Sequence, residues 1–117
     1  MIIAELKSMK CRECAGNISP MEDDEVRMAL RDLQGWIYDA QKKEIRKEWK
    51  MKDFMSAVRF INKLAELAES EGHHPDVHLT GYRRMEIALS THSIGGISSN
   101  DFIMAAKIDD LPKELKR

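Results

Sequence analysis

The chain has 117 residues, and its 19 lysines and arginines nearly balance 20 acidic residues, giving a formal net charge of -1. This length is typical of one domain that buries a modest core without a metal or disulfide. The balanced charge argues against a protein built mainly to bind nucleic acid. No apolar run approaches the roughly 18 residues that a membrane-spanning helix needs. Residues 1–7 lack a cleavage pattern, which predicts no signal peptide and a cytoplasmic location.

Residues 1–18 are predicted to form an irregular lead-in to a single domain over residues 19–117. The lead-in holds Cys11 and Cys14 as a Cys-x-x-Cys pair. A structural zinc site usually takes four ligands, and the chain has no second cysteine pair. Three interpretations therefore stay open: two inert thiols, a local disulfide or redox pair, or half of a metal site shared across a dimer.

A capped helix followed by a β-hairpin opens the domain. The helix is predicted to begin at Ser19, with Glu22 completing a capping box, and to close at Gly35. Residues 36–39 and 44–49 then alternate as two short strands joined by a turn. Because Asn-Gly is missing from that turn, the register of the hairpin is not fixed by the sequence.

A long amphipathic helix over residues 52–71 is the strongest element, with Gly72 as its stop. Its apolar face toward the sheet is predicted to hold Phe54, Val58, Ile61, Leu64, Ala65 and Ala68. Residues 77–79 and 84–90 read as two further strands, and a capping box at Ser98-x-x-Asp101 starts a final helix.

The fold class is therefore α+β. We expect a two-layer sandwich in which helices cover one face of a four-stranded antiparallel sheet. The order is helix, strand, strand, helix, strand, strand, helix.

All four histidines fall between residues 73 and 92. Histidine is the side chain whose unperturbed pKa lies nearest neutral pH, so a cluster of imidazoles favours proton-transfer chemistry. His73 and His74 follow a helix end and His92 follows a strand end. If these ends share one edge of the sandwich, the imidazoles converge near Glu69. His78 lies inside a predicted strand and is interpreted as a surface residue. A zinc site is the rival reading, but adjacent histidines do not easily chelate one ion, and we expect no metal.

Further residues around the histidines give the pattern E-x3-H-H-P-x6-Y-x9-H-x8-D, which runs from Glu69 through Pro75 and Tyr82 to Asp101. With its surroundings, this pattern resembles the pterin-4a-carbinolamine dehydratase family. The likeness extends over nearly the whole chain. It includes Leu33-Gln34-Gly35-Trp36, Phe54 with Ala57 and Phe60, Ala68 to Asp76, Leu89-Ser90-Thr91-His92, Gly95-Gly96-Ile97, and Asp101-Phe102 with Ala105-Ala106.

The resemblance implies a hydro-lyase that converts 4a-hydroxytetrahydrobiopterin to a quinonoid dihydropterin without metal or organic cofactor, in tetrahydrobiopterin recycling. By position it makes His73, His74 and His92 the catalytic histidines, with His74 and His92 expected as the main acid/base pair. Glu69 and Asp101 would orient imidazoles or bind the pterin. Trp36 and Pro75 would supply an apolar wall.

The resemblance also implies a homodimer or homotetramer, with no direct nucleic-acid or membrane partner. Unpaired edges of a small antiparallel sheet make pairing between chains physically reasonable. A second class of function stays open, because some relatives of this fold act as binding, assembly or dimerisation modules. Such a role would use sheet edges or helix faces. A dehydratase acting on a different pterin is a further alternative.

Overall fold

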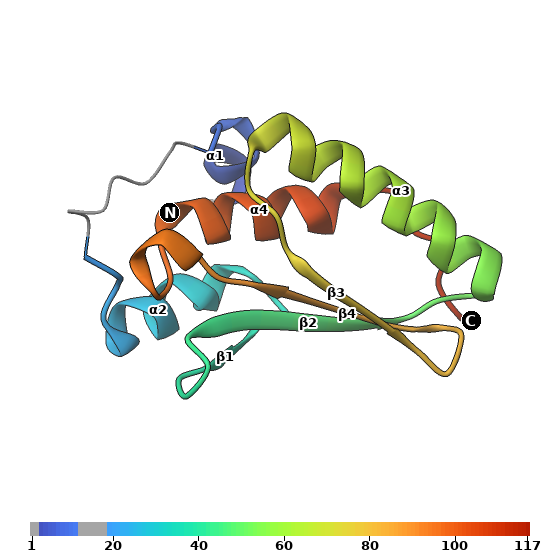
Figure 1. Cartoon of the computed structure of the whole chain (residues 1–117), viewed down its shortest axis with the longest axis horizontal. Helices are drawn as coiled ribbons and strands as arrows, with labels where there is room; N and C mark the ends of the chain where they lie inside the picture. The colour runs from blue at the N-terminus through green and yellow to red at the C-terminus, as the bar shows by residue number, and fades with distance from the viewer. Residues whose placement is uncertain (1–2, 12–18) are drawn as a thin grey trace.

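A computed structural model of the chain describes residues 3–11 and 19–117. Its centre is one antiparallel sheet with the strand order β1-β2-β4-β3. The strands are β1 (Ile37–Asp39), β2 (Glu44–Lys50), β3 (Asp76–Thr80) and β4 (Arg84–Leu89). Helices α3 (Phe54–Glu71) and α4 (Ser99–Asp110) lie on one side of the sheet (Figure 1). The predicted α+β sandwich and its four-stranded antiparallel sheet are confirmed.

The core lies between the sheet and these two helices. Strand β4 supplies Met85, Ile87 and Leu89, which alternate along the strand and are fully buried. The aromatic rings of Trp49 and Phe60 meet across the layers with centroids 5.9 Å apart. This packing fixes α3 against the sheet and so fixes where its C-terminal end points.

The N-terminal lead-in contains a helix, α1 (Ile3–Ser8), so the expectation of an irregular segment is wrong there. Leu6 is buried in the main core, and Lys7 forms an ion pair of 2.9 Å with Asp110 at the end of α4. Because a helix of fewer than two turns carries almost no amphipathic pattern, α1 was not predictable from periodicity, and its tertiary contacts stabilise it. Cys14 lies outside the described residues.

Helix α2 (Asp23–Ala29) begins later than predicted. Its N-cap is Glu22, which forms a capping box with Glu25, and Ser19 lies four residues before the helix starts. The predicted Ser19 cap was therefore wrong, because two capping patterns overlap in this stretch, Ser19 with Glu22 and Glu22 with Glu25, and the later one is used. A short 3₁₀ turn, Leu30–Asp32, follows, and Gly35 has a φ of 87° beyond it.

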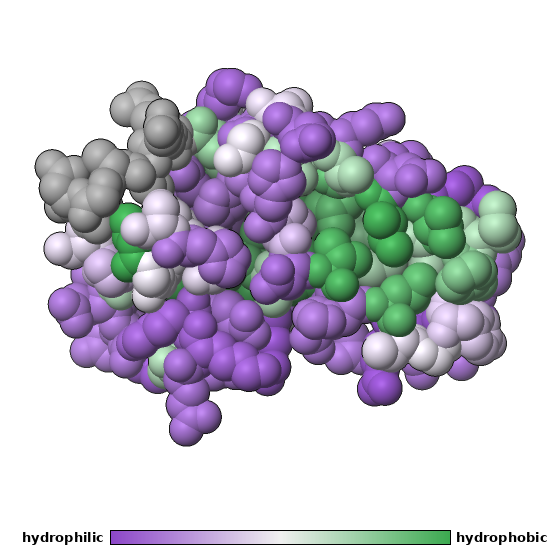
Figure 2. All heavy atoms as spheres, in the orientation of Figure 1, coloured by the Kyte–Doolittle hydropathy of each residue, from purple (hydrophilic) through white to green (hydrophobic). Residues whose placement is uncertain are grey.

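Helix α3 has two apolar sides, and the predicted sheet-facing set wrongly combined residues of both. The side facing the sheet carries Ala57, Phe60, Leu64 and Ala68. Phe54 is 52% exposed, and it starts an outward apolar stripe with Met55, Val58, Ile61 and Ala65. Figure 2 shows hydrophobic atoms gathered over this part of the molecule. The stripe is an unpartnered surface of the single chain.

Among the described residues, no helix is both long enough and apolar enough to cross a bilayer.

Candidate active site

His73 leaves the end of α3 in a conformation that the backbone imposes. Gly72 caps the helix with a φ of 65°, a left-handed conformation that glycine adopts without steric cost. The amide N–H groups of Gly72 and His73 both donate to the carbonyl oxygen of Ala68. The turn therefore redirects the chain and aims the His73 side chain back toward α4.

Asp101, in the first turn of α4, receives the His73 ring. The distance from His73 Nε2 to Asp101 Oδ1 is 2.7 Å, and the Asp101 side chain is completely buried while that of His73 is 11% exposed. The other carboxylate oxygen, Oδ2, accepts from the Thr91 hydroxyl at 2.8 Å and from the Ser98 amide at 3.0 Å. A buried carboxylate surrounded by three donors holds its neighbours rigidly.

The predicted capping box at Ser98-x-x-Asp101 is confirmed, and it explains the geometry of Asp101. Capping uses Oδ2 of the carboxylate and fixes the side-chain rotamer. Oδ1 is then left pointing at the His73 ring. Asp101 thus takes part in the cap of α4 and contacts the His73 imidazole at the same time.

His92 is carried by the loop that follows β4. Its neighbour Thr91 bonds to Asp101, so the backbone of His92 lies at the same end of the sandwich as His73. The loop is closed by hydrogen bonds between Thr91 and Gly96, with the Thr91 amide 2.8 Å from the Gly96 carbonyl oxygen. The side chain of His92 is exposed. The structure therefore joins His73, Asp101 and the His92 loop through one buried network.

Gly96 holds this loop against the segment before α2. A Cβ atom built on Gly96 would lie 2.6 Å from Cβ of Pro20, a distance that side chains do not tolerate. The amide of Met21 donates to the carbonyl of Ile97 at 2.9 Å in the same contact. The segment around Pro20 therefore braces the loop that carries His92.

We expect Gly96→Ala to lower the free energy of unfolding by about 1–3 kcal/mol, because the added methyl overpacks against Pro20. Chemical denaturation measures the change. The double variant Gly96→Ala, Pro20→Gly should recover part of the loss, because it removes the clashing ring. Strictly additive losses in the double variant would contradict the contact.

His74 points the other way from His73, as adjacent residues tend to do. Its Nε2 lies 2.7 Å from Glu69 Oε2, and the two side chains are 62% and 77% exposed. Exposed pairs of this kind contribute little to stability. This contact lies at the rim rather than inside the buried network, and the orienting role of Glu69 stays a prediction. The next residue, Pro75, is half-buried in the segment leading into β3.

Trp36 and Tyr82 lie apart from this network. Trp36 is buried, donates to Asp109 Oδ2 at 3.0 Å and meets the Trp49 ring edge-on, with centroids 5.9 Å apart. Asp109 is two turns of α4 beyond Asp101, about 12 Å along the axis. Tyr82 sits exposed in the β3–β4 turn with a φ of 56°. Trp36 was predicted to form an apolar wall for the pterin. Within the described residues, its contacts with Asp109 and Trp49 do not connect it to the histidine network.

His78 lies on β3 opposite Glu86 of β4. It lines a shallow cavity of about 340 Å³ together with Glu48, Thr80 and Arg84. The core residues of β4 alternate with Glu86, so this cavity is on the face of the sheet away from the helices. This placement agrees with the interpretation of His78 as a surface residue.

A second buried cluster lies beside the histidines. Glu71, the last residue of α3, accepts from the Cys11 amide at 2.8 Å and from the Lys107 ammonium at 2.9 Å. Burial alone would raise the pKa of Glu71, but these two donors outweigh it and hold the pKa below its usual range. The Cys11 thiol donates to the carbonyl of Asn100. The cluster ties the N-terminal segment to both helices that form the site.

The Cys11 thiol is predicted to be unreactive in the folded chain. Burial, with the nearby Glu71 charge, raises the pKa of Cys11 from 9.0 to about 12. In a Cys14→Ser variant, we expect a thiol reagent at pH 8 to modify the native protein on the order of a hundredfold more slowly than the denatured protein. Because the raised pKa disfavours the folded thiolate, the free energy of unfolding should fall as pH rises from 9 toward 12. Equal labelling rates would contradict this burial.

Thr91 and Ser98 are the site residues that sequence reasoning did not assign a role. Thr91 stood in the motif beside His92, and Ser98 was recognised only as a helix cap. Their hydroxyl oxygens lie 2.7 Å apart, and both residues donate to Asp101. One sequence feature could have indicated their role. The capping box that starts at Ser98 follows the Thr91-His92 pair by seven residues.

The histidines lie where the buried Asp101 network reaches the surface, with the His73 side chain 11% exposed and His92 exposed. A cavity of about 710 Å³ opens instead around the C-terminal tail, at the other end of α3. The histidine network is the candidate active site, because buried hydrogen bonds orient its ionisable groups. Within residues 3–11 and 19–117, no group of three or more His, Cys, Asp or Glu side chains is arranged to hold a metal ion. The hydrogen bonds around Asp101 orient the proton donors and acceptors that the network offers.

Comparison with known proteins decides the family. The family model for pterin 4 alpha carbinolamine dehydratase matches residues 19–111. This chain belongs to the pterin-4-alpha-carbinolamine dehydratase family. It is 40% identical to a putative pterin-4-alpha-carbinolamine dehydratase of Nitrosospira multiformis, over 93% of this chain and 94% of the relative. It is 38% identical to the mitochondrial pterin-4-alpha-carbinolamine dehydratase 2 of Arabidopsis thaliana, over 96% of this chain and 62% of the relative.

Solved structures of the dehydratase family share the fold. A transcriptional coactivator/pterin dehydratase from Brucella melitensis superposes with a TM-score of 0.72 at 34% identity, covering 79% of this chain and 97% of that one. A pterin dehydratase-like protein identified as a RuBisCO assembly factor in the alpha-carboxysome superposes with a TM-score of 0.55 at 20% identity, covering 66% and 88%. The second likeness supports the fold alone.

Proposed function

We propose that this protein dehydrates 4a-hydroxytetrahydrobiopterin to quinonoid dihydropterin by histidine acid/base catalysis, in the cytoplasm, as part of tetrahydrobiopterin recycling. The observation that carries the proposal is the His73–Asp101 pair, buried and braced beside the His92 loop. In the reaction, the C4a hydroxyl accepts a proton and its oxygen leaves as water with the C–O electrons. A ring nitrogen loses its proton, and that electron pair forms the new C=N bond.

The contacts suit His73 to one of these proton transfers. When its Nε2–H donates to Asp101, Nδ1 keeps a lone pair and can take a proton from the substrate. His92 and His74 are less restrained and can supply the proton to the leaving hydroxyl. The predicted pairing of His74 with His92 stays a prediction, but the buried carboxylate supports a larger share for His73.

The direct test is an assay of the purified chain. A 4a-hydroxytetrahydropterin is mixed with the protein, and its loss is followed by ultraviolet absorbance against buffer alone. We expect a rate that rises in proportion to protein concentration. A rate equal to that in buffer would reject the dehydratase proposal and leave the binding role.

A non-catalytic binding or assembly role is the second candidate, and a specific observation favours it. The outward stripe of α3 exposes Phe54 and Met55 by 52% and 60%. Strand β3, at the edge of the sheet, also exposes Val77. Apolar surface of this kind often marks a contact between proteins. We infer that it is used first between copies of this chain, as a homodimer or homotetramer.

We expect Phe54→Glu to shift the chain toward smaller species, because a carboxylate in an apolar contact between chains must be desolvated. Sedimentation velocity measures the distribution of species. The matched control is Lys63→Gln, which makes the same change in charge at an exposed position on another side of α3. A wild-type chain that sediments only as a monomer would contradict the oligomer.

A further inference from the structure

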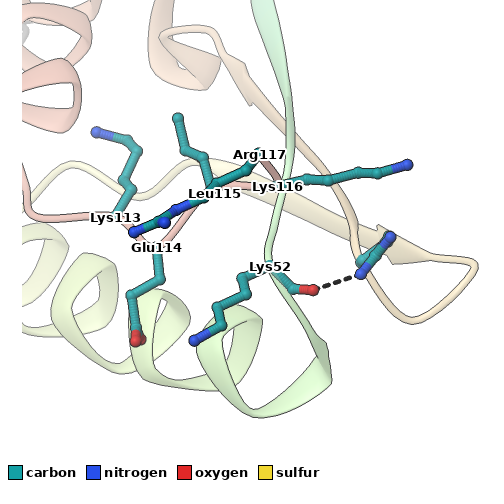
Figure 3. A pocket seen from close by; sticks show the side chains of 7 residues that line it. Lys52, Lys113, Glu114, Leu115, Lys116 and Arg117 are labelled. Carbon is teal, nitrogen blue, oxygen red and sulfur yellow. Dashed lines mark hydrogen bonds between the residues drawn. The ribbon is translucent and has the colours of Figure 1, made fainter.

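A cavity of about 710 Å³ lies beside the C-terminal tail (Figure 3). Backbone pairing builds it: the Lys52 amide donates to the Glu114 carbonyl at 2.8 Å, and the Lys116 amide donates to the Lys50 carbonyl at 2.9 Å. The tail thus runs as an added short strand along the end of β2. Five cationic residues line the cavity: Lys52, Arg83, Lys113, Lys116 and Arg117.

The charge of this cavity contrasts with that of the whole chain, whose formal net charge is -1. The one side-chain carboxylate among the lining residues, Glu114, is already paired with Arg59 at 2.6 Å. The ammonium group of Lys113 also has partners, since it donates to three carbonyl oxygens at the end of α4. Burial lowers the pKa of Lys113. Within residues 3–11 and 19–117, no carboxylate pairs with the cations of Lys52, Lys116 or Arg117, which leaves them to meet a ligand.

Arg83 adds a directional donor. One of its terminal nitrogens donates to the carbonyl of Lys52, the dashed bond of Figure 3. Its Nε is buried and has no hydrogen-bond acceptor within the part of the chain that the structure describes. Buried donors without acceptors are rare in folded proteins. The guanidinium fork of Arg83 matches pairs of phosphate oxygens, so its terminal N–H groups suit an anion in the cavity.

We propose that this cavity binds a small molecule carrying two linked phosphate groups. Its volume falls within the range of small-molecule sites. The Lys52 and Lys116 side chains extend to opposite sides in Figure 3, so two linked phosphates would engage Arg83 and draw in the flexible ammonium group of one of them. A long nucleic acid fits less well, because it would extend beyond this cavity over a chain whose total charge is negative.

This site is separate from the histidine network. Lys52 precedes the first residue of α3 and His73 follows the last, and an 18-residue helix is about 27 Å long. Binding at the tail therefore does not require the proposed dehydration. The two proposals can fail independently.

The test is isothermal titration of the full chain with inorganic diphosphate at low ionic strength. We expect saturable binding that weakens as salt is raised, since the contacts are mainly charge pairs. Arg83→Gln should weaken binding by about tenfold or more, because it removes the charged fork. Lys42→Gln is the matched control, as an exposed lysine of the β1–β2 turn, and should bind as the wild type.

If Arg83→Gln fails to fold, the double variant Lys116→Gln, Arg117→Gln tests the same cavity from the tail. Circular dichroism before each titration checks the fold. Wild-type heats that do not saturate, or a folded Arg83→Gln protein that binds diphosphate like the wild type, would overturn the proposal.

Discussion

His73→Ala is expected to lower kcat for the dehydration by about a hundredfold to a thousandfold, within the range for loss of a positioned acid or base. The reason is the contact with Asp101, which presents one imidazole nitrogen to the substrate and holds the other by a 2.7 Å hydrogen bond. Steady-state kinetics with a 4a-hydroxytetrahydropterin measures the loss. Because the ring is partly exposed, the variant should remain folded.

Two other histidine variants serve as comparisons for the loss of activity in His73→Ala. His78→Ala, on the outer face of the sheet, should retain full activity. His74→Ala should lose about tenfold, because this exposed ring is held only by Glu69. A loss in His74→Ala that equals or exceeds that of His73→Ala would return the main role to His74, as the family pattern alone implied.

Asp101→Ala is expected to have the largest effect on stability, about 2–4 kcal/mol of the free energy of unfolding. The substitution leaves the Ser98 amide, the Thr91 hydroxyl and the His73 ring without their buried acceptor. It also removes half of the capping box of α4. Urea denaturation measures the change, and a loss below about 1 kcal/mol would show that the network contributes little.

Asp101→Asn separates positioning from folding. The amide oxygen can still accept from Ser98 and Thr91, so most of the stability should remain. Its NH₂ group then faces His73 Nε2, which must become an acceptor, and the ring is forced into the other tautomer. We expect kcat to fall by about a hundredfold with little change in KM. Activity close to that of the wild type would exclude the positioning role of Asp101.

Local signals account for what the sequence could predict of the fold. The alternation of Met85, Ile87 and Leu89 and the glycine stop at Gly72 each depend on residues close together in the chain. The capping box of Ser98 and Asp101 is of the same kind. The order of strands and main helices followed from these signals, and the family motif added the candidate histidines.

Local sequence patterns gave wrong predictions where two alternative local structures are possible for the same residues. Residues 19–25 hold overlapping capping patterns, and the acidic pair of Glu22 and Glu25 is used. Helix α3 carries apolar residues on two sides, so periodicity alone could not tell that Phe54 faces outward. Helix α1 is too short for periodicity and depends on its contact with α4.

The sequence by itself determined an α+β sandwich in which an acid and two neighbouring imidazoles lie at a helix end and a third histidine follows a strand end. Only the tertiary structure decided which imidazole is held by a buried carboxylate. His73 and Asp101 are 28 residues apart, and their contact exists because Gly72 turns the chain back and α4 packs beside α3. Adjacent side chains such as His73 and His74 point apart. The choice between them therefore depends on packing across the layers, which no short-range pattern contains.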